Sequence, residues 1–244
     1  MDGETVIFEK RGSVAWLTLN RPAAYNAISL QVRDELWALL EVVALDPEIG
    51  VAVFRGAGDR AFSSGADLTE FGTSPSFTEA RRARQERDLW GRMAHFEKPI
   101  IAAVHGYALG AGCELCFYCD FRIASEDARF GLPEVSLGYL PSAGGTQTVS
   151  RAIGLGRALD LVCTGTPVTA RQALEWGLVN QVVPREQLDA ISEKLARRLL
   201  AQPSTALRAA KAAVLRGLDL TLDQGLSIEA SMRIKLASSR SGWS

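Results

Sequence analysis

The sequence has little net charge, no long apolar run and no secretory start, and each shortage argues against a class of function. Its 27 basic and 28 acidic side chains leave a formal net charge of −1, which favours neither nucleic acid nor an anionic membrane as partner. No apolar run approaches the roughly twenty residues of a membrane-spanning helix, and no charged start leads into an apolar segment. We therefore expect a cytoplasmic protein that binds a small molecule.

The cysteines do not form a complete metal-binding pattern. Cys113, Cys116 and Cys119 follow one another at three-residue spacing, but a ferredoxin-like cluster needs a fourth cysteine nearby, and Cys163 is distant. At this spacing the thiols lie along one flank of a helix, where free cysteine behaves as a small hydrophobe. We expect these thiols to pack in the core and expect no metal site.

Apolar residues are plentiful: they make up 47% of the 244 residues, enough for a sizeable core. Apolar positions at residues 6–8 and 14–19 predict an antiparallel hairpin. A helix is predicted from an N-cap at Ser29 to Asp46, followed by a strand at residues 51–54. The order strand, helix, strand implies a crossover between parallel strands, so the fold class is α/β.

The second half of the sequence is predicted to be mainly helical. Helical patterns cover residues 157–163, 170–176, 186–201, 204–216 and 222–237, with a short strand at 178–183. We expect residues 1–190 to form an α/β core with the active site, and residues 191–244 a C-terminal helical region that packs on the core or on a neighbouring subunit. Residues 79–95 predict a half-exposed helix whose arginines, Arg81, Arg82 and Arg84, face solvent.

Residues 106–120 place flexible backbone beside one carboxylate. The apolar run 100–104 predicts a buried strand and the run after Gly112 a buried helix, so the glycines occupy a strand-to-helix turn. Such turns direct free N–H groups at a ligand. Glu114 lies within this apolar context, where a carboxylate is costly unless it is hydrogen-bonded or used. Glu114 is thus a candidate catalytic residue, and a capped or paired structural residue is the alternative.

Two further turns of small residues carry candidate ligand-facing groups. Residues 58–68 leave a predicted strand through small residues, and residues 140–146 open a helix that runs to about Ile153. Glu134 precedes the second of these turns and is the second candidate carboxylate.

Other active-site patterns fail on their spacing. A dinucleotide fingerprint needs a third glycine where Leu115 stands, and no G-x-S-x-G elbow or phosphate-binding G-x-x-x-x-G-K-[ST] loop occurs. The histidines are His95 and His105, and His105 immediately precedes a turn glycine, where a structural role is the more common one.

Taken together, several segments resemble the crotonase, or enoyl-CoA hydratase/isomerase, superfamily. The matching segments, in chain order, are RP with NA (21–22 and 26–27), FSSGADL (62–68), IAAVHG (101–106), GAG (110–112), CDF (119–121), PSAGGTQ (141–147) and ALEWGLV (173–179). The resemblance implies a crotonase-like fold, in which repeated ββα units form a spiral core and C-terminal helices form a trimerisation region. It also implies an acyl-CoA thioester as substrate and a homotrimer or dimer of trimers, with no cofactor because CoA is part of the substrate.

The resemblance assigns the thioester oxygen to two backbone N–H donors, those of Ala66 and Ala111. Both alanines follow a glycine in a small-residue turn, and Ala111 begins the helix that carries Glu114, where the helix dipole is positive. In this family a pair of glutamates marks the members that hydrate a conjugated double bond, and Glu114 and Glu134 match both positions. By resemblance, Glu114 activates water and Glu134 serves C2, and we expect the two carboxyls to titrate as a coupled pair with one pKa raised.

Further residues are assigned by resemblance to substrate binding. They are Ser64, Asp67 and Leu68 along the adenine and pantetheine path, Arg21 and Asn26 near the nucleotide end, and Ser142 beside the water. Asp67 has a helix cap as its alternative role. Ser142 stands where many hydratases have glycine, so its hydroxyl either holds the water or crowds it.

The sequence therefore predicts an enoyl-CoA hydratase, a lyase that converts a 2-enoyl-CoA into a 3-hydroxyacyl-CoA. Two alternatives remain open. One is a Δ3,Δ2-enoyl-CoA isomerase that uses Glu134 alone, and the other is a non-catalytic acyl-CoA-binding protein of the same fold.

Overall fold

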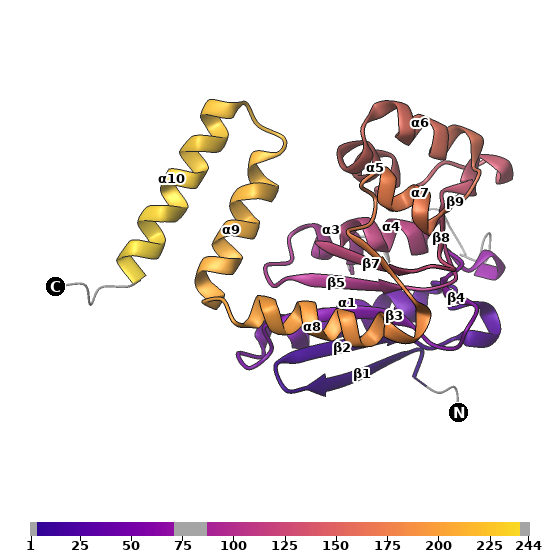
Figure 1. Cartoon of the computed structure of the whole chain (residues 1–244), viewed down its shortest axis with the longest axis horizontal. Coiled ribbons are helices and arrows are strands. Elements are labelled where there is room, and N and C mark those ends of the chain that lie inside the picture. Colours follow the sequence, from indigo (N-terminus) through magenta and orange to yellow (C-terminus); the bar gives the residue numbers. More distant parts are fainter. Residues whose placement is uncertain (1–3, 71–86, 240–244) are drawn as a thin grey trace.

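The computed structural model describes residues 4–70 and 87–239, whose strands form two sheets (Figure 1). Within these residues, the larger sheet is six-stranded in the order β1-β2-β3-β5-β7-β10, and the smaller is four-stranded in the order β4-β6-β8-β9. The larger sheet comprises β1 (Val6–Arg11), β2 (Val14–Leu19), β3 (Val51–Gly56), β5 (Ile100–Val104), β7 (Phe121–Ser125) and β10 (Gln181–Val183). The smaller comprises β4 (Ala61–Ser63), β6 (Tyr107–Leu109), β8 (Arg129–Gly131) and β9 (Val168–Thr169).

Strand pairing confirms the predicted hairpin and the α/β class. β1 and β2 are antiparallel, whereas β2, β3, β5, β7 and β10 are parallel to one another in that order. The crossover between β2 and β3 is α1 (Leu30–Leu45), and the hydroxyl of Ser29 caps it by accepting a hydrogen bond from the N–H of Val32.

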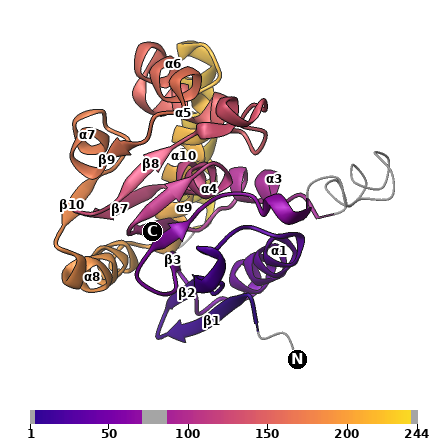
Figure 2. The same cartoon turned by 90° about the vertical axis from the view of Figure 1, so that its right-hand side faces the viewer.

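The parallel strands of the larger sheet are apolar on both faces. On β3, Ala52 and Phe54 join one core cluster, while Val51 and Val53 join another on the opposite face. Helix α8 (Leu188–Leu200) covers the second cluster, and α1 lies on the other side of the strands (Figure 2). Both faces of the sheet are therefore removed from water.

A repeated unit relates the two sheets. β3, β5 and β7 are neighbours in the larger sheet, and each is followed directly by a strand of the smaller sheet: β4, β6 and β8 respectively. Helices then follow these pairs: α3 (Leu89–Ala94), α4 (Ala111–Tyr118), and the 3₁₀ helix η3 (Pro133–Leu137) with α5 (Gly145–Ile153). This repetition confirms the ββα spiral expected for the crotonase-like fold.

The remaining helices divide between the core and a protruding hairpin. α6 (Leu155–Thr164) packs on α5 and η3, and α7 (Ala170–Glu175) packs on β8 and β9. α9 (Ser204–Gly217) and α10 (Leu222–Ser239) form a hairpin that extends away from the sheets (Figure 1). The expected division after residue 190 falls within α8, whose Leu188, Ala196 and Leu199 belong to the sheet core.

One other expectation falls partly on residues that the structure does not describe. The predicted helix at 79–95 overlaps the described segment only from residue 87, where α3 is found, and Arg81, Arg82 and Arg84 lie outside it. Over residues 4–70 and 87–239, none of the helices combines the length and apolarity required to cross a bilayer.

One partly buried ion pair fastens the C-terminal hairpin to the core. Lys211 of α9 donates to Oδ2 of Asp120 at 2.7 Å and to the carbonyl oxygen of Lys98 at 2.9 Å. The same carboxylate oxygen accepts the N–H of Ile100 at the start of β5, so one oxygen joins the hairpin to the larger sheet. The side chains of Lys211 and Asp120 are only 10% and 16% exposed.

We predict that Lys211→Met lowers the free energy of unfolding by about 1–3 kcal/mol, because it leaves the Asp120 carboxylate without its cation. Arg208→Met is the matched control, since Arg208 reaches Glu97 only at 3.8 Å and is 40% exposed. Urea titration of both variants measures the difference, and an equal loss in the two would contradict the anchoring role of Lys211.

Candidate active site

The candidate site lies where three adjacent parallel strands of the smaller sheet end. Ala66 follows β4, Ala111 and Glu114 follow β6, and Glu134 follows β8. β6 pairs in parallel with both β4 and β8, so the carboxyl ends of all three strands lie along one edge. Groups that are separated along the chain are thereby gathered at the edge where α/β proteins commonly bind ligands.

Glycines allow the two alanine turns to approach each other closely. Gly65 and Gly110 have φ values of +104° and +48°, which other residues rarely adopt. A Cβ on Gly65 would lie 2.8 Å from the carbonyl oxygen of Leu109 and 3.4 Å from the nitrogen of Ala111. The turn before Ala66 therefore packs directly on the turn before Ala111, and side chains would separate them.

The N–H groups of these alanines are unused by the rest of the described chain. Ile28 pairs with Ala66 in an isolated parallel bridge, but its hydrogen bonds run to the carbonyl of Gly65 and from the N–H of Asp67. Within residues 4–70 and 87–239, the N–H groups of Ala66 and Ala111 have no hydrogen-bond acceptor. Both remain available to a ligand, and that of Ala111 lies at the N-terminus of α4.

The Glu114 carboxylate is held by the start of α5. Its Oε1 accepts hydrogen bonds from the N–H of Ala143 at 2.9 Å and of Gly145 at 2.7 Å. Gly145 is the first residue of α5, which has no side-chain cap, so Glu114 supplies the anion that this helix end favours. The structural alternative considered above is therefore partly right: Glu114 does cap a helix, but through one oxygen.

The pKa of Glu114 is raised to about 7, chiefly by burial and secondarily by the negative charge of Glu134, which together outweigh the lowering effect of the N–H donors of Gly145 and Ala143. The residue is 2% exposed. A carboxyl with such a pKa exchanges protons readily near neutral pH, which suits a general acid or base.

Glu134 lies against the turn that precedes Ala111. A Cβ on Gly110 would lie 3.1 Å from Oε1 of Glu134, so this carboxylate contacts the residue just before Ala111. Its Oε2 is buried and has no hydrogen-bond partner within the described residues. Burial raises the pKa of Glu134 too, so both carboxyls have raised pKa values, where one was expected.

Arg21, Asn26 and Asp67 form one linked group beside the Ala66 turn. Arg21 donates to Oδ2 of Asp67 at 2.8 Å, and Asp67 Oδ1 accepts from the N–H and hydroxyl of Thr69. These bonds lower the pKa of Asp67 despite its partial burial. The hydrogen bond from the Thr69 side chain has the largest effect, and that from Arg21 the next largest. The predicted capping role of Asp67 is thus present, at the 3₁₀ helix η2 (Leu68–Glu70).

Asn26 is 2% exposed, and its side-chain hydrogen bonds within the described residues all involve backbone. Its Oδ1 accepts from the N–H of Arg21, and its Nδ2 donates to the carbonyls of Ala57 and Ala61. Asn26 itself has a φ of +56°. Its amide fixes the loop that carries Arg21 against the strand that leads to Ala66.

The other expected binding residues lie on the surface of these turns. Ser64, Leu68 and Ser142 are exposed. Ser142 immediately precedes Ala143, one of the donors to Glu114, so its hydroxyl lies on the turn that holds this carboxylate.

The cysteines and His105 lie apart from this chemistry. Cys113, Cys116 and Cys119 are buried in the apolar core, where burial raises the pKa of each thiol. The pKa of His105 is lowered to about 4 by burial and by the charge of Arg185. Across the described ranges, no group of three or more His, Cys, Asp or Glu side chains is placed to hold a metal ion.

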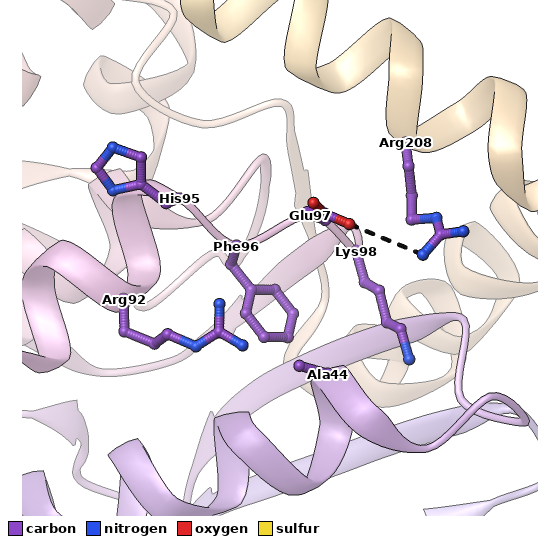
Figure 3. Close-up of a pocket in the computed structure, with 7 residues that line it drawn as sticks. All are labelled: Ala44, Arg92, His95, Phe96, Glu97, Lys98 and Arg208. Atoms are coloured by element: carbon purple, nitrogen blue, oxygen red, sulfur yellow. Dashed lines mark ion pairs between the residues drawn. The ribbon is translucent and has the colours of Figure 1, made fainter. Parts of the chain in front are cut away.

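A separate cavity of about 200 Å³ lies at the base of α9 (Figure 3). It is lined by Ala44, Arg92, His95, Phe96, Glu97, Lys98 and Arg208. Its most buried cation, Lys98, donates to the carbonyls of Val43 and Asp46, and Arg92 pairs with Glu41. Since these charges are already engaged and none of the candidate site residues lines the cavity, we assign it no catalytic role.

Sequence reasoning missed two parts of the site. The first is the pair of amides, Ala143 and Gly145, that hold Glu114, although their glycine-rich turn was recognised as ligand-facing. The second is Tyr118, which ends α4 and contacts Gly144. The only available signal was its position four residues after Glu114, which places both on one helix face.

Comparison with known proteins relates this geometry to one family. The model of the enoyl-CoA hydratase/isomerase family matches residues 9–242. The short-chain-enoyl-CoA hydratase of Clostridium acetobutylicum is 38% identical over 94% of this chain and 88% of its own length. The 2,3-dehydroadipyl-CoA hydratase of Escherichia coli is 41% identical over 95% of this chain and 90% of its own.

A solved Thermobifida fusca structure in complex with CoA superposes on this chain with a TM-score of 0.89. The two are 30% identical, over 97% of this chain and 94% of the other. The similarity therefore extends from the sequence to the whole fold.

Burial of Glu114 predicts a pH-dependent stability. Its pKa is raised from the ordinary 4.5 to about 7, so the folded state binds its proton more tightly than the unfolded state does. Protonated Glu114 thereby contributes to the free energy of unfolding. This contribution is fully present below the ordinary pKa of 4.5 and is lost as the pH rises through about 7. Glu114→Gln stays neutral and its oxygen still accepts both N–H groups, so we expect it to be more stable than the wild type by about 1–3 kcal/mol near pH 8.5.

Urea unfolding of both proteins at about pH 5 and about pH 8.5 tests this expectation. The difference in free energy of unfolding between Glu114→Gln and the wild type should be smaller at about pH 5. A difference between the two proteins that is the same at both pH values would contradict the raised pKa.

Proposed function

This chain belongs to the enoyl-CoA hydratase/isomerase family, and from its paired glutamates we propose that it hydrates a 2-enoyl-CoA to a 3-hydroxyacyl-CoA. The observation that carries the proposal is that Glu114 and Glu134 flank the turn of Ala111 at one sheet edge. An isomerisation needs one group to move a proton, whereas hydration needs one to take a proton from water and one to give a proton to carbon.

The first part of the proposed mechanism is polarisation of the thioester. The carbonyl oxygen accepts hydrogen bonds from the N–H groups of Ala66 and Ala111, which have no acceptor within the described residues. These donors stabilise the enolate oxygen that forms when water attacks C3, and each donor of this kind is worth roughly 3 kcal/mol in comparable sites. Because both belong to backbone, their alignment depends on the close contact of Gly65 with the Gly110 turn.

The second part is proton transfer. Glu114, ionised and held by one oxygen, takes a proton from water as its oxygen bonds to C3. Glu134, whose pKa is raised by burial, gives its proton to C2 of the enolate. After the reaction Glu114 is protonated and Glu134 is ionised. Before the next turnover Glu114 must lose its proton and Glu134 must regain one. These steps need neither a metal ion nor a redox cofactor, and we propose that none takes part.

The linked group of Arg21, Asn26 and Asp67 is proposed to shape the CoA path. Arg21 pairs with Asp67 beside the Ala66 turn, and Asn26 holds the Arg21 loop. Ser64 and Leu68 expose their side chains on the same turn, where they can contact the pantetheine arm. Ser142 is proposed to contact the water, next to the amide that holds Glu114.

Compartment is a further part of the proposal. The cysteines of this chain are free thiols, as is usual for proteins of a reducing compartment, so we propose that it acts in the cytoplasm.

One observation favours a second candidate, a Δ3,Δ2-enoyl-CoA isomerase. Oε1 of Glu114 is committed to the start of α5, whereas Oε2 of Glu134 is buried without a partner in the described residues. If Glu114 only caps the helix, Glu134 alone would move a proton between C4 and C2. The products separate the two candidates, because an isomerase forms a conjugated thioester that a hydratase consumes.

We predict that the purified protein consumes crotonyl-CoA, measured as loss of absorbance of the conjugated thioester. Glu114→Gln and Glu134→Gln should each lower kcat by about 100-fold or more, because each removes one proton-transfer group. Glu175→Gln on the exposed surface of α7 is the matched control and should retain full activity. Unchanged activity in either site variant would overturn the two-glutamate assignment. A wild-type enzyme that only converts a 3-enoyl-CoA into its conjugated isomer would favour the isomerase.

The C-terminal hairpin supports a proposal for assembly as a homotrimer or dimer of trimers. Neither α9 nor α10 has a buried residue in the described chain, although both carry large apolar side chains. The most exposed of these are Val214, Leu222, Leu226 and Ile234, and Leu218 is exposed directly after α9. Two helices without a core gain little stability alone, so a second surface is needed to cover them.

We predict that sedimentation equilibrium gives a mass of three or six chains, and that Val214→Glu combined with Leu222→Glu shifts it towards the monomer. These residues are 69% and 78% exposed, so the charges are tolerated in a monomer and excluded from an apolar interface. The control is Arg171→Glu combined with Arg198→Glu, because both arginines are exposed, on α7 and α8. A monomeric wild type, or an assembly that survives both hairpin charges, would contradict this role of the hairpin.

A further inference from the structure

Tyr118 is a half-buried phenol one helical turn beyond Glu114. It is the last residue of α4, so the two side chains leave the same face of the helix. Its ring stacks on that of Trp90 in α3, with centroids 5.8 Å apart and planes inclined by 27°. The stack fixes the ring and thereby the direction of its hydroxyl.

The hydroxyl of Tyr118 contacts Gly144. A Cβ on Gly144 would lie 2.1 Å from the phenolic oxygen and 3.1 Å from Cζ, so only glycine leaves room for this ring. Gly144 adopts a φ of +99° and, as the residue before α5, has no side chain of its own with which to cap this helix. The turn is therefore held by contacts from α4: the Glu114 carboxylate bonds to it, and Tyr118 packs against it.

The two contacts act on the same three residues. Gly144 lies between Ala143 and Gly145, whose N–H groups both donate to Oε1 of Glu114. A shift of Gly144 towards the phenol would carry both donors with it. Filling the space beside Gly144 is therefore one way to keep both hydrogen bonds short.

From this geometry we propose that Tyr118 is a positioning residue for Glu114, which packs its hydroxyl on Gly144 and so holds the amides of Ala143 and Gly145 on the carboxylate. The proposal rests on the function proposed above, in which Glu114 acts as the base. It assigns Tyr118 no contact with the reacting atoms.

The charges around Glu114 define what loosening this turn would do. Its titratable neighbours are Glu134 on η3 and Cys113 and Tyr118 on its own helix, while Asp88, before α3, acts on Tyr118. Burial and then the charges of Glu114 and Asp88 raise the pKa of Tyr118, so the phenol stays neutral. The two N–H donors favour the ionised form of Glu114, so lengthening their bonds raises the pKa of Glu114.

The test is the pH profile of kcat for Tyr118→Phe, which keeps the ring stack and removes the hydroxyl. In the wild type, kcat should fall below about pH 7 as Glu114 is protonated. In the variant this fall should occur about 0.5 to 1 pH unit higher, lowering kcat at pH 7 by roughly two- to fivefold with KM unchanged. The ratio of variant kcat to wild-type kcat should rise towards 1 at alkaline pH, because Glu114 is ionised in both proteins there and both lose the Glu134 proton alike. A loss of folded enzyme would lower this ratio equally at every pH. Tyr107→Phe, on the exposed side of β6, is the control and should match the wild type.

A profile for Tyr118→Phe that superposes on the wild type, or one that is lowered equally at every pH, would overturn the proposal. Carbon NMR can monitor the titration of the Glu114 carboxyl in the wild type and in Tyr118→Phe. This measurement does not require turnover. Should the wild type hydrate no 2-enoyl-CoA, the proposed function fails, and this titration still decides whether Tyr118 tunes Glu114.

A second pair of variants tests the contact itself. Gly144→Ala introduces a Cβ against the phenolic oxygen, so its loss of Tm should be smaller in the Tyr118→Phe background than in the wild type. Equal losses in both backgrounds would show that the hydroxyl does not press on Gly144.

Discussion

The hydrogen bonds from the start of α5 to the Glu114 carboxylate are the interaction on which this site depends. They join α4, which carries one candidate N–H donor at its first residue, to the turn that begins the next helix. A buried carboxylate without partners would be protonated or would destabilise the fold, and two amides at a positive helix end offset part of that cost. The bonds occupy one oxygen, so Glu114 can hold the turn that begins α5 and still have an oxygen for chemistry.

The second constraint on the site is its need for small residues, because backbone N–H groups can reach a ligand only where no large side chain covers them. Gly65 and Gly110 bring two turns into contact, and Gly144 and Gly145 do the same for the turn above Glu114. A Cβ on Gly65, Gly144 or Gly145 would lie 2.8 Å or less from a neighbouring atom. The resulting site gathers two N–H groups that have no acceptor among the described residues, and two carboxyls with raised pKa values, at the ends of β4, β6 and β8. Such an arrangement can stabilise an enolate and move protons to and from it.

Much of the core is predictable from sequence because its pattern is local. The apolar runs of β2, β3 and β5 and the Ser29 cap of α1 are enough to indicate strand, helix and parallel pairing. The smaller sheet was not predicted, because β4, β6, β8 and β9 have two or three residues each and show no period. Glu114 and Glu134 were identified from their context and their resemblance to a family. Their raised pKa values depend on burial by segments far along the chain, and the contact of Tyr118 with Gly144 joins different helices, so neither follows from local sequence.

The most direct test of the proposed site is a crystal structure of the protein with a bound CoA thioester. The thioester oxygen is predicted to lie about 2.7–3.1 Å from the nitrogens of both Ala66 and Ala111. The Glu114 and Glu134 carboxylates are predicted to lie beside C3 and C2 of the acyl group. A thioester oxygen bound away from these two nitrogens, or an acyl group out of reach of either carboxylate, would contradict the proposed mechanism.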